Sequence, residues 1–169
     1  MMSRSAKLVT VMFMAFSLAT TAVAGDIDGA FDGLSGAAGF NAPITPDYEF
    51  AGFVGYNSEL GNGLVAGGEF ELAYNNKSLW GLNATTGTLD GRAGYLLMDD
   101  VFVYGRAGVG YTTGGGGSAV WDAGAGVEFP VMEDVRLRGE FERVDPFESG
   151  MMTQYNGKVG VAVEIGRAH

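Results

Sequence analysis

The sequence contains no cysteine, a single histidine and few basic residues, and each shortage excludes a class of function. Without cysteine there is no disulfide, no thiolate nucleophile, no cysteine-ligated metal and no cysteine-linked lipid anchor. The histidine is His169, the last residue, which lies beyond the last predicted strand. Lysine and arginine number 10 against 20 acidic residues, whereas nucleic-acid binding requires clustered basic residues.

The N-terminal residues follow the pattern of an export signal. Arg4 and Lys7 precede an uncharged, mostly apolar run over residues 8–19. Ala22-Val23-Ala24 then supplies the small residues that signal peptidase accepts. The run is shorter than the roughly 20 residues that a membrane-spanning helix needs. We therefore expect cleavage after Ala24 and export of the rest of the chain.

This cleavage divides the chain into a signal peptide, residues 1–24, and a mature domain, residues 25–169. Without Arg4 and Lys7, 8 of the 10 basic residues remain against 20 acidic ones, a net charge of −12. No later apolar stretch is long enough for a transmembrane helix, because charges or glycines interrupt each one. If the mature domain spans a membrane, it must do so as a closed β-barrel, which also pairs every backbone N–H and C=O within lipid.

Apolar and polar residues alternate with a period of two along the mature domain, which indicates β-strands. Most of the predicted strands have about 11 residues, close to the 9–11 that a tilted strand needs to cross a bilayer. We expect an all-β fold, an eight-stranded antiparallel up-and-down transmembrane β-barrel. The predicted strands are 28–40, 47–57, 64–74, 87–97, 101–112, 119–129, 135–145 and 154–165.

The connections predict which end of the barrel faces the cell. The second, fourth and sixth are short and rich in Asn, Asp, Gly or Pro, as tight turns require, and the others tend to be looser. With both termini on one side, the turns would lie at the periplasmic end and the loops outside. The predicted turns are 58–62 with Gly63, 98–100 and 130–134, and the predicted loops include 75–86, 114–117 and 146–152.

Most predicted strands have one apolar and one polar face, and the polar faces taken together carry charges of both signs. In strand 154–165, for example, Val161 and Val163 share one face while Lys158 and Glu164 share the other. An eight-stranded barrel has room inside only for side chains, so interior charges would have to pair. The excess of acids would make any solute passage favour cations. The predicted lumen charge network is Glu49, Glu69, Glu71, Asp90, Arg92, Arg106, Asp122, Glu128, Arg136, Arg138, Glu140, Glu142, Lys158 and Glu164.

The apolar face carries aromatic residues near both ends of the strands. Two aromatic belts around an aliphatic band are typical of membrane barrels, where amphipathic rings lie at the headgroup level. A period of two does not itself say which face points inward. A soluble periplasmic barrel that carries an apolar ligand therefore remains an alternative. The predicted membrane-interface aromatics are Tyr48, Tyr56, Tyr74, Tyr95, Tyr111, Trp121, Phe129 and Tyr155.

The sequence predicts no catalytic residue, no cofactor and no metal site. The pairs Glu69/Glu71 and Glu140/Glu142 each project from one strand face, and we interpret them as partners of interior arginines rather than as a glycosidase pair. The glycine run 114–117 lacks the Lys-Ser/Thr of a phosphate loop. We expect a protein that is not an enzyme.

Five stretches of the mature domain stand out: Phe31–Phe40 (FDGLSGAAGF), Leu89–Tyr95 (LDGRAGY), Val103–Tyr111 (VYGRAGVGY), Asp122–Phe129 (DAGAGVEF) and Val135–Arg143 (VRLRGEFER). They resemble strands of a known family of small outer-membrane barrels, the opacity-type and alphaproteobacterial 25-kDa class of the porin family. The resemblance covers nearly the whole mature domain and implies a Gram-negative outer-membrane location and a structural, adhesive or pore-like role. Such barrels usually end in an aromatic residue that the assembly machinery reads, whereas this chain continues past Ile165 to His169.

The leading functional expectation is an integral barrel with a structural and surface role in the cell envelope. Its expected partners are outer-membrane lipid, lipopolysaccharide and, during biogenesis, the barrel-assembly machinery, and we expect a monomer that binds no nucleic acid. A further alternative is an adhesin or surface antigen that acts through the loops 75–86 and 146–152.

Overall fold

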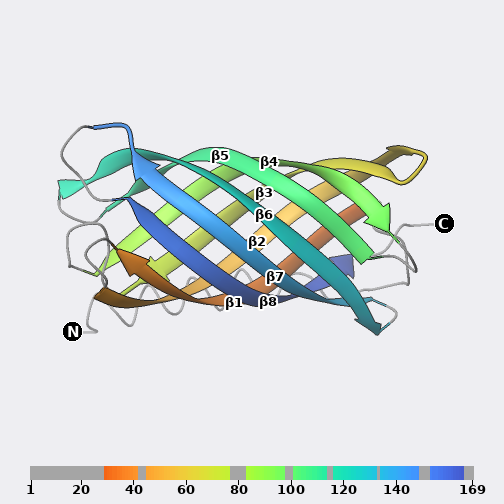
Figure 1. Ribbon diagram of the computed structural model, residues 1–169, viewed down its shortest axis with the longest axis horizontal. Helices are drawn as coiled ribbons and strands as arrows, with labels where there is room; N and C mark the ends of the chain where they lie inside the picture. The colour runs from red at the N-terminus through yellow and green to blue at the C-terminus, as the bar shows by residue number, and fades with distance from the viewer. Residues whose placement is uncertain are drawn as a thin grey trace, which may run out of the picture.

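The computed structural model describes residues 29–41, 45–76, 83–97, 101–113, 116–132, 134–148 and 153–165. These form a closed antiparallel barrel in which each strand pairs with its neighbours in sequence and β1 pairs with β8 (Figure 1). The expected eight-stranded up-and-down barrel is confirmed, while the signal peptide predicted over residues 1–24 lies outside the described residues. The strands are β1 (Gly29–Asn41), β2 (Thr45–Gly61), β3 (Leu64–Asn75), β4 (Ala84–Leu97), β5 (Val101–Thr112), β6 (Ser118–Met132), β7 (Val135–Pro146) and β8 (Gln154–Ile165).

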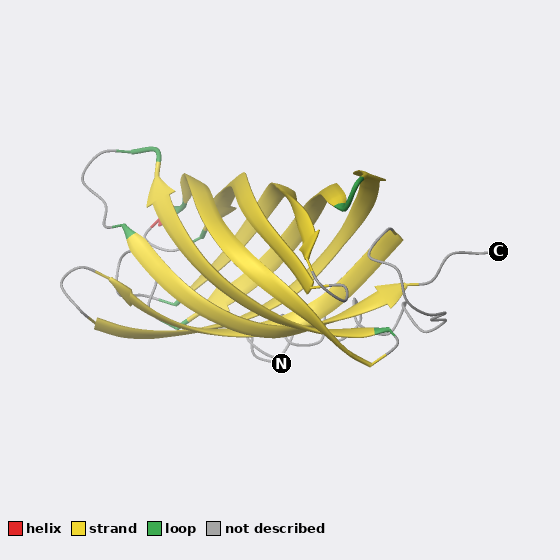
Figure 2. Ribbon diagram, turned by 45° about the vertical axis from the view of Figure 1, so that its right-hand side comes forward, coloured by secondary structure: helices red, strands yellow, loops and turns green. Residues whose placement is uncertain are grey.

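The barrel has two distinct ends, which we name by their connections. At the turn end β2 is followed by β3, β4 by β5 and β6 by β7, and the opposite end, where β1, β3, β5 and β7 end, is the loop end (Figure 1). Figure 2 shows the tilted strands as one closed layer. The described residues include no helix long and apolar enough to cross a membrane.

Two of the predicted turns are shorter than the sequence indicated. β2 continues to Gly61 and β3 begins at Leu64, so the predicted turn 58–62 was wrong and the chain reverses at Asn62 and Gly63. Asn62 and Gly63 have φ angles of 55° and 76°, and such left-handed conformations suit a hairpin whose strands twist to the right.

The turn predicted at 130–134 also begins too early. β6 runs on to Met132, and its pairing with β7 slips between Pro130 and Met132, since proline has no N–H for the ladder. The strands likewise take in both edges of the predicted loop 75–86, because β3 ends at Asn75 and β4 begins at Ala84. The turn predicted at 98–100 lies outside the described residues.

The barrel interior is filled by side chains at every second position of the strands. Apolar groups close it on the turn side: Val65, Phe102 and Tyr104 form one buried cluster, and Phe31 and Phe53 belong to a second. A smaller cluster lies nearer the loop end, where Val120 packs on Val144. The interior between these clusters is polar, and it contains the candidate site.

Candidate functional site

In this barrel charged side chains face the interior and apolar side chains face outward. All fourteen residues predicted for the lumen charge network are at least nine-tenths buried. On the outer face, Phe50, Leu89 and Val159 are each more than 60% exposed. A soluble monomer exposes its charges and rarely exposes large continuous apolar patches. The outer face is therefore suited to contact an apolar environment.

The eight aromatic residues predicted at the membrane interface all lie on this outward face, six of them exposed and Trp121 and Tyr155 half-buried. They form a row toward each end of the barrel. On both β2 and β6 the two rows are eight residues apart, from Tyr48 to Tyr56 and from Trp121 to Phe129. Eight residues of strand span about 26 Å, or about 20 Å along the axis of a barrel with a tilt of about 40°. This is close to the apolar band of about 25 Å in outer-membrane barrels.

Arg138 and Glu69 form the centre of the buried charge network. The Nη1 and Nη2 atoms of Arg138 donate to the two carboxylate oxygens of Glu69 at 2.7 and 2.8 Å, a fork geometry that is among the strongest for an ion pair. Arg138 also donates to Glu140 at 2.7 Å, and Tyr104 donates its hydroxyl to the same oxygen at 2.8 Å. Both Arg138 and Glu69 are 1% exposed, so this pair closes the middle of the barrel to water.

Arg92 links this centre to the aromatic cluster on the turn side. It donates to Glu69 at 2.9 Å and to Glu128 at 2.5 Å. Its guanidinium lies 4.1 Å from the ring centroid of Tyr104 and 4.9 Å from that of Phe31. The aromatic faces stabilise the buried cation where water is excluded.

Arg136 extends the network along β7 toward the turn end. Its Nε lies 3.5 Å from Glu128, and its Nη1 lies 3.5 Å from Glu164 on β8. Two carboxylates on different strands therefore share this one arginine, which ties β6, β7 and β8 together.

Arg106 is shared among several carboxylates. Its closest contact is 2.7 Å from Nη2 to Asp90, while Glu69 and Glu140 both lie 3.4 Å from Nη1. Asp122, Glu142 and Glu71 follow at 3.8, 3.8 and 3.9 Å. A single cation thus offsets part of the negative charge of residues from four strands.

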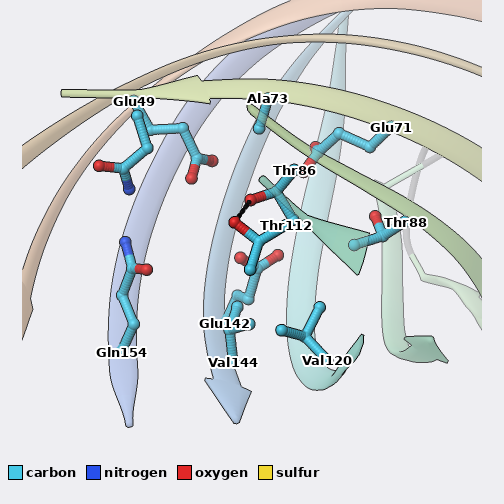
Figure 3. A pocket seen from close by; sticks show the side chains of 11 residues that line it. Glu49, Glu71, Ala73, Thr86, Thr88, Thr112, Val120, Glu142, Val144 and Gln154 are labelled. Atoms are coloured by element: carbon cyan, nitrogen blue, oxygen red, sulfur yellow. Dashed lines mark hydrogen bonds between the residues drawn. The ribbon is translucent and has the colours of Figure 1, made fainter. Parts of the chain in front are cut away.

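Lys158 forms a second centre nearer the loop end. Its Nζ lies 2.5 Å from Glu71, 2.8 Å from Glu142 and 3.3 Å from Glu49. These three carboxylates line a cavity of about 20 Å³, measured as the space open to the centre of a water molecule, together with Thr86, which donates to Thr112 at 3.0 Å (Figure 3). That space has room for about one water molecule and is too small for an organic ligand.

The network holds nine carboxylates and five basic groups. Buried charges without partners are costly, and several carboxylates here share one cation rather than each having its own. Among the described strands and connections, no group of three or more histidine or acidic side chains has the geometry of a metal site.

Sequence reasoning missed the neutral polar residues and the aromatic residues inside the barrel. Asn156 donates to Glu142 at 3.1 Å, and Gln154 donates to Asn156 at 3.0 Å. Both share the face of Lys158 at a spacing of two residues, so the alternation contained the signal. The same holds for Phe102 and Tyr104, which share the face of Arg106 on β5.

Comparison with protein-family models gives no match, and comparison with curated protein sequences gives none either. Solved structures with the same fold include the Yersinia pestis attachment invasion locus protein Ail, which has a TM-score of 0.56 and 12% identity over 80% of this chain and 98% of Ail. Neisserial surface protein A has a TM-score of 0.54 and 13% identity over 82% of this chain and 97% of its own.

The N-terminal β-barrel domain of Pseudomonas aeruginosa OprF is similar to the same degree, with a TM-score of 0.54 and 13% identity over 80% of this chain and 97% of that domain. Identities this low show the fold alone, and the resemblance to the opacity-type family stays a prediction. The chain therefore has the fold of the small eight-stranded outer-membrane barrels.

Proposed function

We propose that residues 25–169 form an integral barrel of the Gram-negative outer membrane, with a structural and surface role and no catalytic one. The observation that carries this proposal is the inside-out distribution of polarity. A band of exposed apolar residues lies between two rows of aromatic residues, and fourteen charged side chains of both signs are buried together inside. In lipid an exposed apolar band is stabilising, whereas in water it would promote aggregation.

The alternative, a soluble periplasmic carrier of an apolar ligand, requires an apolar interior and a polar exterior. Here the middle of the interior is charged, and the cavity beside Lys158 has room for about one water molecule. An apolar ligand would have to displace ion pairs such as Arg138 with Glu69 and leave their charges without partners, which costs several kcal/mol.

The packing of the interior supports a barrel that passes few solutes. Val65, Phe102, Glu69, Arg138 and Asp122 are all at most 1% exposed, so they cannot line a water-filled pore. Any residual passage would favour cations, because nine carboxylates face five basic groups. Planar-bilayer recordings test this part: we expect conductance near the baseline, and a stable conductance with anion selectivity would contradict it.

The biogenesis and surface contacts are further parts of the proposal. In this assignment the signal peptide of residues 1–24 directs export, and the barrel-assembly machinery inserts the mature domain. The protein then resides as a monomer among phospholipid and lipopolysaccharide, with the connections at the loop end exposed to the outside. An adhesin or surface-antigen role would depend on those connections.

Fractionation of the full chain expressed in a Gram-negative host tests the proposed location. We expect the protein in the outer-membrane pellet, resistant to carbonate, soluble only in detergent, and with an electrophoretic mobility that changes on heating. A periplasmic protein and a resident outer-membrane barrel serve as markers for the two fractions. Recovery of the folded protein in the osmotic-shock fraction would refute the proposal.

A further inference from the structure

Arg143 on β7 is unlike the other basic side chains in the described strands, because it points outward. Arg92, Arg106, Arg136, Arg138 and Lys158 all lie inside the barrel. The side chain of Arg143 is 48% exposed on the outer face, which is otherwise rich in apolar residues. Arg143 therefore takes no part in the charge network inside the barrel.

Arg143 lies in the row of aromatic residues near the loop end. It is paired directly with Tyr155 on β8 and with Ala123 on β6 in the sheet. Its guanidinium carbon lies 5.5 Å from the ring centroid of Trp121 and 6.0 Å from that of Tyr155. In the proposed membrane orientation this row lies at the headgroup level of the outer leaflet, where an outward arginine costs about 0–1 kcal/mol rather than the larger penalty at mid-membrane.

The surroundings hold this guanidinium in place without using all of its donors. Its Nε lies 2.6 Å from the carboxylate of Asp145, which also accepts a hydrogen bond from the hydroxyl of Thr153. Asp145 is 8% exposed and acts as a positioning residue for Arg143. A guanidinium has five N–H donors, so one carboxylate contact leaves donors for a further acceptor.

We propose that Arg143, between Trp121 and Tyr155, binds the phosphate of an outer-leaflet lipid such as lipopolysaccharide. Arginine binds phosphate through paired N–H donors, and this is the outward cation that the described strands offer to an anionic headgroup. Toward the middle of the apolar band the same strand exposes Phe141, whose ring stacks on Tyr155 at 6.2 Å and provides an apolar surface for an acyl chain. The inference rests on the proposed outer-membrane location and names a lipid contact within it.

Lipid binding to purified protein tests the site. The barrel is refolded in a mild detergent and titrated with bisphosphorylated lipid A, with a dephosphorylated form of the same lipid, and with inorganic phosphate. Bound lipid is counted by native mass spectrometry, and the midpoint of the heat-induced gel shift reports stabilisation. The variants are Arg143→Gln, Arg143→Lys and, as a matched control in the same aromatic row, Tyr111→Phe. The gel shift also verifies that each variant is folded.

We expect Arg143→Gln to weaken binding of bisphosphorylated lipid A roughly tenfold or more, because a charge-assisted contact to phosphate is lost. Arg143→Lys should have an intermediate effect, since lysine keeps the charge but not the fork. Tyr111→Phe should match the wild type, and the dephosphorylated lipid should bind wild type and Arg143→Gln equally.

Two results would overturn the lipid site. The first is binding of bisphosphorylated lipid A to Arg143→Gln within twofold of the wild type. The second is a wild type that binds inorganic phosphate as tightly as the lipid, which would make the site one for a free anion. Both results are separable from a failure of the proposed location, which the fractionation experiment detects on its own.

Discussion

Replacing Arg138 by methionine should test whether the buried network stabilises the barrel. Methionine keeps an unbranched side chain but removes the guanidinium that contacts Glu69 at 2.7 and 2.8 Å and Glu140 at 2.7 Å. Glu69 would keep Arg92 at 2.9 Å and Arg106 at 3.4 Å, so it would not be fully orphaned. Removal of one partner from a buried ion pair typically costs about 3–5 kcal/mol. We expect a loss in that range for the free energy of unfolding.

A double-mutant cycle separates the pair from a general packing defect. The variants are Arg138→Met, Glu69→Met and the double variant. If the two side chains stabilise each other, the double variant should lose about 2–3 kcal/mol less than the sum of the single variants, because contacting residues are strongly non-additive. Urea-induced unfolding in phospholipid vesicles, followed by tryptophan fluorescence and by the heat-dependent gel shift, gives the free energies.

The outward Arg143 on the same strand provides a matched control. The Arg143 side chain is 48% exposed although its partner Asp145 is largely buried, and ion pairs open to solvent contribute about 0–1 kcal/mol. Arg143→Met should therefore cost far less than Arg138→Met. The reasoning would be refuted if the free energy of unfolding of Arg138→Met lay within 1 kcal/mol of the wild-type value. It would also be refuted if the losses of Arg138→Met and Glu69→Met simply added in the double variant.

Three other substitutions test the outer face, the interior packing and the hairpin turn. Val161→Arg places a charge in the outward apolar band, where we expect a loss of about 2–4 kcal/mol in vesicles, and an unchanged stability would contradict a lipid-facing position. Gly108→Ala should lower the free energy of unfolding by about 1–3 kcal/mol, because its Cβ would lie 2.2 Å from an oxygen of Asp90. Gly105→Ala is the control, since its Cβ meets nothing nearer than 3.9 Å. Equal unfolding midpoints for the two variants would contradict this packing. Gly63→Ala forces an alanine to a φ of 76° and should lower the free energy of unfolding by about 1–2 kcal/mol in the same urea assay. An unchanged free energy would mean that the turn relaxes freely.

The residues that share a strand face were predictable from the sequence one by one, but their partners on other strands were not. A period of two places Lys158 and Glu164 on one face of β8 without reference to any other strand. The ion pair between Arg138 and Glu69 joins residues 69 positions apart, and it depends on how the strands are staggered around the barrel. The aromatic cluster inside the barrel was not predicted although Tyr104 and Arg106 share a face, because a charged side chain marks the polar face of a strand whereas an aromatic one occurs on either face.

The turns show the limit of composition as a guide to boundaries. The cluster of polar and glycine residues before Leu64 indicated a turn of five residues, but hydrogen bonding carries β2 on to Gly61. Pairing continues wherever a partner strand lies opposite, so the length of β2 depends on β3 as well as on its own residues. The left-handed φ angles of Asn62 and Gly63 then mark where reversal occurs.

By itself, the sequence determined that eight alternating strands exist and which residues share a face, because the direction of side chains along a strand follows from local backbone geometry. Only the tertiary structure decided which face is concave, since an alternating pattern is identical whether its charged side points in or out. Closure between β1 and β8 fixed that choice. It enclosed the carboxylates and guanidiniums with one another and turned the apolar band outward.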